Sequence, residues 1–256
     1  MNRIHLFEFE DQIWFPQFLR NYVTDFLQFL SNKTKIYKPI IPIIKKGLLK
    51  SNTNQIIDLA SGGGGGLLWL NKELQQEIPE LKITLTDYYP NISAFELTKS
   101  QAGNFDFLTD SIDARNVPSN LKGLRTQFLS FHHFKPEDAK QILQNAINTN
   151  SSIAVFEVQE RSVQSLIAML LSPVSVILST PFIRPFKIGR ILFTYLIPIV
   201  PLIVLWDGVV SSFRTYSVKE MNELVTSLEG TTEYDWEIGK AKNVLYLLGT
   251  KKHINN

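Results

Sequence analysis

Hydrophobic positions follow two different spacings along this chain of 256 residues. Between residues 12 and 49, phenylalanine, leucine and tyrosine recur every three or four positions, which predicts an amphipathic helix and a second short helix after Pro39. Further on, short apolar runs predict strands, and segments between them predict helices. The strands are expected at 55–60, 82–87, 105–110, 124–131 and 152–158, and the helices at 66–78, 91–101 and 135–149. Strands that alternate with helices in this way predict a parallel sheet covered on both faces.

The alternation ends after the fifth predicted strand. Residues 165–206 are strongly apolar and are interrupted by the basic segment IRPFKIGR. The next stretch predicts a helix with Ser217 as its N-cap, Glu220 at the capping-box position and Gly230 as its C-cap. Residues 234–252 show two strand patterns around a tight polar turn, which predicts a final antiparallel pair.

The composition narrows the chemistry. The chain has no cysteine, which excludes disulfides, zinc–thiolate sites and cysteine nucleophiles, and we expect no metal site. A net charge of +2 is too small to indicate nucleic acid as a partner. Acidic residues interrupt the first 15 positions, where a signal peptide needs an apolar run. We therefore expect a cytoplasmic protein.

The segment IIDLASGGGGGLLWL places five consecutive glycines, Gly62 to Gly66, between a predicted strand and a predicted helix. Such a junction indicates a ligand-binding corner, because glycine permits unusual dihedral angles and the helix start offers free N–H groups. A Walker phosphate loop is excluded, because no Lys-Ser or Lys-Thr pair follows. The dinucleotide fingerprint fits weakly, and only from a start at Ala60.

The pattern Asp58-x-Ala60-x-Gly62-x-Gly64 resembles the first motif of the class I S-adenosylmethionine-dependent methyltransferases, an acid followed by three alternating glycines. Alanine replaces the first glycine, a departure that adds only a methyl group. The resemblance covers most of the chain outside the N-terminal helices and residues 162–206. It implies a Rossmann-like α/β fold with a mostly parallel sheet, a C-terminal antiparallel hairpin and helices on both faces.

Two further landmarks of that family have counterparts here. An acid ends the second strand, where Asp87 stands, and an aspartate follows the third strand, where Asp113 stands. In that family, the carboxylate at the end of the second strand accepts both ribose hydroxyls of S-adenosylmethionine, and a neighbouring aromatic ring packs on the adenine. The cofactor-binding residues that the resemblance implies are Asp58, Ala60, Gly62, Gly64, Asp87, Tyr88, Asp113 and Ala114. A helix cap or a solvated strand end is the alternative role for each acid.

The chemistry requires little covalent help from the protein. Methyl transfer from a sulfonium depends on holding the nucleophile in line, and a base is needed only where the acceptor loses a proton. His132 and His133 follow the fourth strand, and either imidazole is suited to that role, with packing against loops as the alternative. Strand alternation predicts that their rings point in opposite directions. The candidate substrate-binding residues are Glu157, Arg214 and Tyr216. A surface ion pair is the alternative for Glu157, and a charge that ties down its own loop is the alternative for Arg214.

The apolar residues 165–206 raise the question of membrane contact. Each of their two runs falls short of the about 20 residues that a span needs, and both contain prolines. Two spans would also carry the basic turn of Arg184, Lys187 and Arg190 across the membrane, against the positive-inside tendency. We expect a hairpin of broken helices that caps the substrate pocket, contacts one leaflet through its basic turn, or does both. Either arrangement implies an acceptor that is at least partly apolar.

These observations divide the chain into an N-terminal helical lid (1–50), a cofactor-binding half (51–161), an apolar helical insertion (162–208) and a C-terminal helix with its hairpin (209–256). The function predicted is methyl transfer from S-adenosylmethionine to oxygen or nitrogen of a small, hydrophobic molecule. One alternative is an NAD(P)-dependent oxidoreductase, which predicts a tyrosine with a lysine four residues later, and no tyrosine here has one. The other is a non-catalytic, membrane-peripheral protein with a nucleoside pocket. The oligomeric state stays open.

Overall fold

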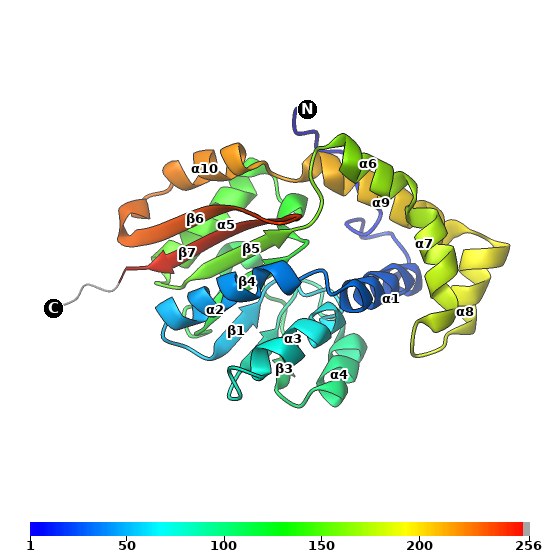
Figure 1. Cartoon of the computed structure of the whole chain (residues 1–256), viewed down its shortest axis with the longest axis horizontal. Coiled ribbons are helices and arrows are strands. Elements are labelled where there is room, and N and C mark those ends of the chain that lie inside the picture. The colour runs from blue at the N-terminus through cyan, green and yellow to red at the C-terminus, as the bar shows by residue number, and fades with distance from the viewer. Residues whose placement is uncertain (253–256) are drawn as a thin grey trace.

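A seven-stranded sheet forms the centre of the computed structural model, which describes residues 1–252 (Figure 1). The strand order is β3-β2-β1-β4-β5-β7-β6. β1 to β5 are parallel, and β7 runs antiparallel to both of its neighbours. The strands are β1 (Gln55–Asp58), β2 (Lys82–Leu85), β3 (Phe105–Phe107), β4 (Leu124–Phe128), β5 (Ile153–Glu157), β6 (Tyr234–Ala241) and β7 (Val244–Lys251). The predicted sheet and its C-terminal hairpin are confirmed.

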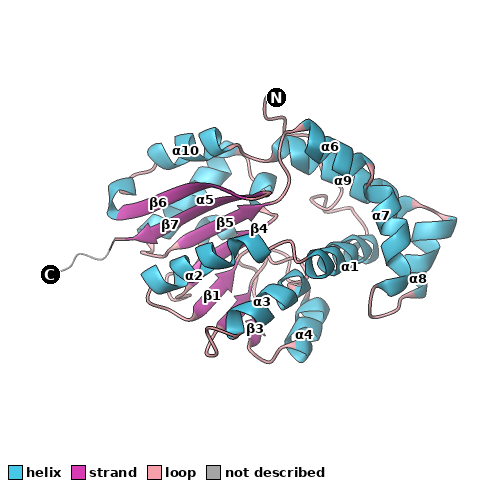
Figure 2. Cartoon of the chain, in the orientation of Figure 1, coloured by secondary structure: helices cyan, strands magenta, loops and turns pink. Residues whose placement is uncertain are grey.

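Helices cover both faces of this sheet (Figure 2). One face is packed against α2 (Ile41–Lys50), α3 (Leu68–Gln75) and α4 (Ile92–Gln101), and the other against α5 (Pro136–Asn148) and α10 (Val218–Thr226). Neighbouring side chains on one strand serve different cores, because successive residues point to opposite faces. Ile56 belongs to the first core and Ile57 to the second.

The end of α10 differs from the prediction. Ser217 and Glu220 form the expected capping box, but the helix ends at Thr226, with Ser227 rather than Gly230 as its C-cap. The chain leaves the helix early because Leu228 is buried in the core and the backbone of Glu229 is hydrogen-bonded to Gln144. Gly230 has φ 70° and begins a short 3-10 turn instead.

The remaining helices form an arm beside the sheet (Figure 1). α1 (Gln17–Thr34) packs against α7 (Ser172–Ser179) and α9 (Ile199–Arg214), with α6 (Val163–Leu170) and the short α8 (Ile188–Ile191) completing the group. Their shared core includes Val23, Phe26, Val176, Ile203 and Val204. Among the described residues, no helix alone has the length and apolarity to cross a membrane. Two pairs bent by 42° and 77° reach that length and composition only when joined.

The strand order places a crevice at the carboxyl ends of β1 and β4. β2 and β3 lie to one side of β1, while β4 and β5 lie to the other, so the connections leave in opposite directions. Ligands of open α/β sheets bind at such a switch point. The loops after β1, β2 and β4 converge here.

Candidate active site

A cavity of about 580 Å³ occupies the crevice. Its walls come from residues 10–13, helix α1 and the loops that follow β1, β2 and β4. The predicted site residues on its lining are Asp58, Ala60, Gly62, Gly64, Asp87 and His133. Within the described residues, none of 162–208 lines it, so the apolar insertion does not cap this cavity.

The glycine loop has the backbone that its sequence predicts. Gly62 and Gly64 have φ 57° and 70°, in the left-handed region that favours glycine. A Cβ on Gly64 would overlap the side chain of Leu85, whereas one on Gly62 would meet nothing within 4 Å. Ala60 also has a left-handed φ of 53°. Replacing the family's glycine by Ala60 therefore costs more than the space for a methyl group. A residue with a Cβ is strained in this left-handed conformation by about 1–2 kcal/mol.

Helix α1 holds the loop from the other side. Asn32 donates through Nδ2 to the Gly65 carbonyl at 2.8 Å and accepts the Trp69 N–H at 2.7 Å. A Cβ on Gly63 or Gly65 would collide with the side chain of Gln28 on α1. The extra glycines thus make room for α1, a role that the sequence analysis did not find. The only feature of the sequence that indicates this role is the polar side of the amphipathic helix α1, which carries Gln28 and Asn32.

Asp58 lies at the base of the cavity. Its side chain is buried, and Oδ1 accepts a hydrogen bond from Thr126 Oγ1 at 2.7 Å. Burial raises the pKa of Asp58 to about 7, although hydrogen bonds from Ser61 and Thr126 oppose that rise. A cationic ligand group in the cavity would favour the ionised carboxylate.

Asp87 ties the glycine loop to the end of β2. One carboxylate oxygen accepts the Gly62 N–H at 2.9 Å and the other accepts the Tyr89 N–H at 2.8 Å. Burial raises the pKa of Asp87, while these backbone hydrogen bonds oppose the rise. The ring on the lining is that of Tyr89, whereas the predicted Tyr88 does not line the cavity. The two rings meet edge to face, with centroids 4.8 Å apart.

Asp113 and Ala114 are not brought to the cavity. Asp113 caps a 3-10 turn by accepting the Arg115 N–H at 2.9 Å, and it forms an ion pair with the Arg115 guanidinium at 2.8 Å. Arg115 also pairs with Asp138 on α5 at 2.9 Å. Ala114 is buried in the core under α5. The position of Asp113 matches the alternative of a local cap.

His132 is buried and held by Glu157. The His132 backbone N–H donates to Glu157 Oε1 at 3.0 Å, and Nδ1 lies 2.8 Å from Oε2. Glu157, predicted to bind substrate, is fully buried and orients this histidine instead. Neither residue lines the cavity.

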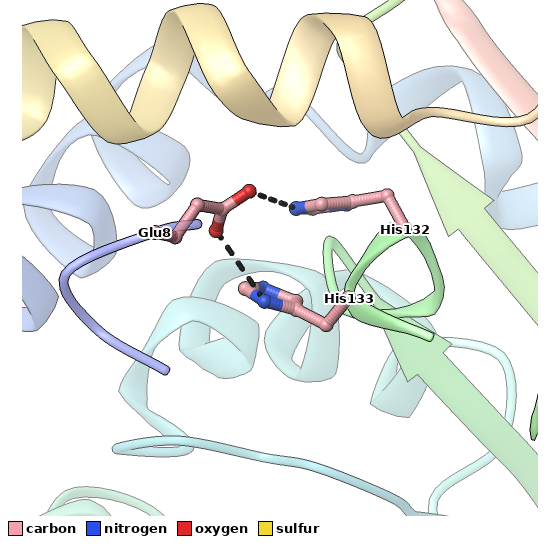
Figure 3. Close-up of side chains that lie close together, drawn as sticks. All are labelled: Glu8, His132 and His133. Carbon is pink, nitrogen blue, oxygen red and sulfur yellow. Dashed lines mark ion pairs between the residues drawn. The ribbon is translucent and has the colours of Figure 1, made fainter. Parts of the chain in front are cut away.

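His133 does line the cavity, and its ring lies beside that of His132 (Figure 3). β4 ends at Phe128 and the histidines form a 3-10 turn, so the expectation of opposite directions is wrong, and the ring centroids are 4.3 Å apart. His133 Nδ1 lies 2.7 Å from Asp11 Oδ1 and 3.3 Å from Glu8 Oε2. Burial alone lowers the pKa of His133, but the two carboxylates outweigh it and raise the pKa to about 10. An imidazole protonated at neutral pH is a poor proton acceptor.

The carboxylates come from the N-terminal segment, and Glu8 of this segment points toward both histidine rings (Figure 3). Glu8 is buried, and Oε1 lies 3.2 Å from Arg214 Nη1 and accepts the Ser211 hydroxyl at 3.1 Å. Arg214 also pairs with Asp11 at 2.6 Å. The buried Arg214 guanidinium thus holds the N-terminal segment in place. It does not line the cavity, so the structure does not place it where the predicted role in substrate binding requires.

Tyr216 is likewise turned inward. Its hydroxyl donates to the Phe134 carbonyl at 2.7 Å, and the guanidinium of Arg3 lies 4.1 Å from its ring centroid. The ring is buried and lies outside the lining. It fixes the loop after the histidines.

Glu8, His132 and His133 offer three ligand atoms within 4.8 Å of one another, the spacing of a metal site. Arg214 Nη1 already lies 3.2 Å from Glu8, and His133 holds a proton at neutral pH. These positive charges oppose a metal cation in the same place. The cluster is therefore an ion-pair network.

Glu10 is the cavity residue that the sequence analysis missed. Its backbone N–H donates to Asp207 Oδ2 at 3.2 Å, and its carbonyl accepts Arg20 Nε at 3.1 Å. Glu10 lies on the cavity lining, and its carboxylate has no hydrogen bond or ion pair to any described residue. Burial, reinforced by nearby Asp207, raises the pKa of Glu10 to about 8. No motif marks this acid in the sequence.

Comparison with known proteins places the fold. No protein-family model matches the sequence, and no curated protein matches it. The structure is similar to an O-methyltransferase family protein from Burkholderia thailandensis, with 12% identity, a TM-score of 0.52, and coverage of 88% of this chain and 59% of that one. It is similar to human N-acetylserotonin methyltransferase bound to S-adenosylmethionine, with 15% identity, a TM-score of 0.50, and coverage of 89% and 56%.

A third similar structure is PigF with S-adenosylhomocysteine, with 18% identity, a TM-score of 0.51, and coverage of 94% of this chain and 63% of that one. The chain thus spans less than two thirds of the length of each of these three proteins. At these identities the likeness concerns the fold. On that basis, and as the order of its motifs predicts, this chain has the fold of the class I S-adenosylmethionine-dependent methyltransferases.

Proposed function

We propose that this protein transfers a methyl group from S-adenosylmethionine to oxygen or nitrogen of a small, partly apolar molecule. The observation that carries the proposal is the convergence of the left-handed glycine loop, Asp58 and Asp87 on one cavity at the switch point of the sheet. The methyltransferase fold found in the comparisons supports it.

The cavity residues fit the cofactor. Each oxygen of Asp87 accepts one backbone N–H, which leaves a lone pair on each for a ribose hydroxyl. The open space at Gly62 lets a ligand approach the backbone. Asp58 supplies negative charge opposite the ammonium and sulfonium groups. When bound, the cofactor supplies a methyl group already activated on sulfur.

The remaining lining residues indicate which kind of acceptor molecule would fit the cavity. Phe128, Phe134 and Leu27 give the cavity apolar walls, while Glu10 and His133 give it a charged end. A flat or aliphatic molecule with one polar group suits this combination. The protein's part in the reaction is then to exclude water and to hold that group in line with the methyl carbon.

We further infer that Glu10, rather than either histidine, accepts the proton of the acceptor group. Glu10 lies on the cavity lining, its carboxylate has no hydrogen bond or ion pair to a described residue, and a pKa of about 8 is close to the working pH that favours a general base. The charged groups around it are Asp207, His133, Glu8 and Asp11. His133, protonated and paired with Asp11, positions this end of the cavity.

We place the protein on the cytoplasmic side of a membrane, in partial contact with it through residues 165–206. S-adenosylmethionine is made in the cytosol, and an apolar acceptor concentrates in lipid.

Calorimetric titration with S-adenosylhomocysteine tests the cofactor site. We expect wild-type protein to bind and Asp87→Asn to lose affinity by about 10- to 100-fold, because hydrogen bonds to a charged group contribute about 1.5–3 kcal/mol each. Asp235→Asn is the matched control, since Asp235 is an exposed acid on β6 that pairs with Lys50 away from the cavity. Its affinity should equal that of the wild type.

Absence of wild-type binding at millimolar S-adenosylhomocysteine would overturn the proposal. Titration with NADH in the same cell separates the oxidoreductase alternative, because tight binding of NADH in its place would favour that reading of the glycine loop.

A further inference from the structure

The arm exposes an unusual amount of apolar surface. α6 has no buried residue at all, although it is composed mainly of aliphatic side chains. Exposed positions recur at three- and four-residue spacing within α6 and again from Leu171 through α7, and the two helices meet at a bend of 42°. The large exposed apolar residues of this region are Val163, Ile167, Leu170, Leu171, Val174, Ile177, Leu178, Phe182, Phe186, Ile188, Leu192, Tyr195, Leu196, Ile197, Leu202 and Trp206. We call this set the apolar face.

The apolar face offers almost nothing for hydrogen bonding. Between residues 163 and 206, the exposed side chains with a polar group are those of Gln164, Arg184, Tyr195 and Trp206. The Tyr195 hydroxyl donates to the Ile177 carbonyl at 2.6 Å, and Trp206 Nε1 donates to the Phe7 carbonyl at 3.0 Å. The sequence from 162 to 206 contains no acidic residue.

The N-terminal segment extends this face to the cavity. The Phe7 ring lies against Trp206, with centroids 5.3 Å apart. Trp14 and Ile13 are 67% and 88% exposed, and Ile13 also lines the cavity. An apolar path therefore runs from the arm to the rim of the cavity.

The basic turn is less available than the sequence predicts. Lys187 and Arg190 both pair with Asp25 on α1, at 2.8 and 2.6 Å, and Arg190 is buried. Arg184 is the one residue of the three that has no carboxylate partner among the described residues, and its Nη1 donates to the Pro181 carbonyl at 2.9 Å. Because Asp25 offsets one of the three positive charges, the turn keeps a net charge of two, and electrostatic attraction through it is reduced.

We propose that the apolar face docks into one leaflet of a lipid bilayer, and that it does so by burying apolar side chains rather than by charge attraction. Soluble monomers rarely expose contiguous apolar patches larger than a few hundred Å². A protein partner is a poor match, because protein interfaces carry about one hydrogen bond per 100–200 Å² and a polar rim. Helices satisfy their own backbone groups, so this face can enter a medium without water.

Docking would bring the Ile13 edge of the cavity close to the membrane. On the proposed function, an apolar acceptor then passes from the leaflet into the cavity without crossing water. The docking itself does not depend on catalysis.

Flotation with vesicles of pure phosphatidylcholine tests the proposal. We expect wild-type protein to float with these neutral vesicles and to remain bound when salt is raised to about 0.5 M, where charge attraction is screened. Leu171→Glu with Leu178→Glu should reduce the bound fraction at least about tenfold, because carboxylates are costly to bury in lipid. Leu49→Glu is the control, since Leu49 is 82% exposed on α2, away from the face.

A second measurement introduces no charge. Brominated phosphatidylcholine should quench the fluorescence of wild-type protein, and the quenching should disappear in Trp14→Phe with Trp206→Phe, which keeps Trp69 and Trp236. Circular dichroism and a thermal unfolding transition like that of the wild type show that each variant is folded.

Three outcomes would overturn the docking. They are no flotation of wild-type protein, flotation only with anionic vesicles and only at low salt, and self-association without lipid that the double glutamate variant abolishes. Flotation of a protein that binds no S-adenosylhomocysteine would leave the docking intact and refute the proposed function.

Discussion

The cavity has two walls that are built differently. The glycine wall consists of residues 58–66 and 85–89, two strand ends with their loops, and its carboxylates are held by backbone N–H groups and one hydroxyl. The acid wall consists of Glu10, Asp11 and His133 on the lining and of the residues of 8–11, 132–133 and 207–214 packed behind them. Glu8 and Asp11 are held by side chains of opposite charge, and Asp207 is held by two backbone N–H groups. The first wall is local to the sheet. The second exists only when the N-terminal segment brings Glu8 and Asp11 against the histidines.

On the proposed function, this difference separates cofactor binding from proton chemistry. Backbone groups give the glycine wall a fixed shape, which suits recognition of a ligand that is always the same. The acid wall concentrates four carboxylates around two cations, and it shifts the pKa values of Glu10, Asp207 and His133 toward or past neutrality. Changes in the two walls should therefore affect different measurements.

The largest effect is expected from Glu10→Gln. It should lower methyl transfer to a hydroxyl acceptor by about 10²- to 10⁴-fold and leave S-adenosylhomocysteine binding unchanged. A base acts when ionised, so the wild-type rate should rise with pH through about 8 and then level off, and the variant should lack that rise. The assay is transfer of labelled methyl to an acceptor identified by screening a lipid and metabolite extract.

The same ionisation can be followed without an acceptor. Carbon NMR of glutamate-labelled protein should show one carboxyl that titrates near pH 8 and is missing in Glu10→Gln. Titration of Glu10 near its ordinary pKa of 4.5 would refute its role as the base.

Glu8→Gln should have the next largest effect, and on stability rather than on cofactor affinity. Removing one charge from a buried network leaves Arg214 and protonated His133 undercompensated, at about 3 kcal/mol of unfolding free energy. Glu77→Gln breaks an exposed pair with Lys45 and should cost less than about 1 kcal/mol. Urea denaturation measures both. Equal losses in the two variants would contradict the network.

The smallest effects are expected from alanine substitutions at two positions of the glycine wall, Gly64 and Gly62. Gly64→Ala should lower stability by about 2–3 kcal/mol, from left-handed strain and overlap with Leu85. Gly62→Ala has the same strain but open space, so its stability loss should be about 1 kcal/mol, while its added methyl should weaken S-adenosylhomocysteine binding. Thermal unfolding and calorimetry distinguish them. A reversed order would mean that Gly62, not Gly64, is packed.

The two walls also explain which parts of the molecule the sequence predicts. The sheet, the glycine loop and Asp87 follow from strand patterns, because the end of a strand fixes where the next residues lie. In the same wall, the tyrosine on the cavity lining is Tyr89, one residue after the predicted Tyr88. Asp113 stands where the order of the family's motifs predicts a cofactor-binding aspartate. It forms an ion pair with the nearby Arg115 instead and does not reach the cavity.

The acid wall could not be predicted in the same way. Glu10 gains its environment from Asp207, which is almost 200 residues distant, and no periodicity links the two. His132 and His133 were found by their place after β4, but their roles depend on Glu157 and Asp11, whose positions are set by tertiary contacts. The apolar insertion was recognised by composition, yet only the structure shows that Asp25 occupies two of its three basic residues.

Helix α1 touches both the arm and the glycine loop. Asp25 is bonded to Lys187 and Arg190 on one side, and Asn32, seven residues later, is bonded to the Gly65 carbonyl and the Trp69 N–H on the other. Two turns of one helix thus connect the lipid-facing helices to the backbone that would cradle the cofactor. Coupling between two binding events is reciprocal in free energy. On the two proposals made above, α1 therefore offers a direct route by which membrane docking would change the affinity for the cofactor and cofactor binding would change the docking by the same free energy.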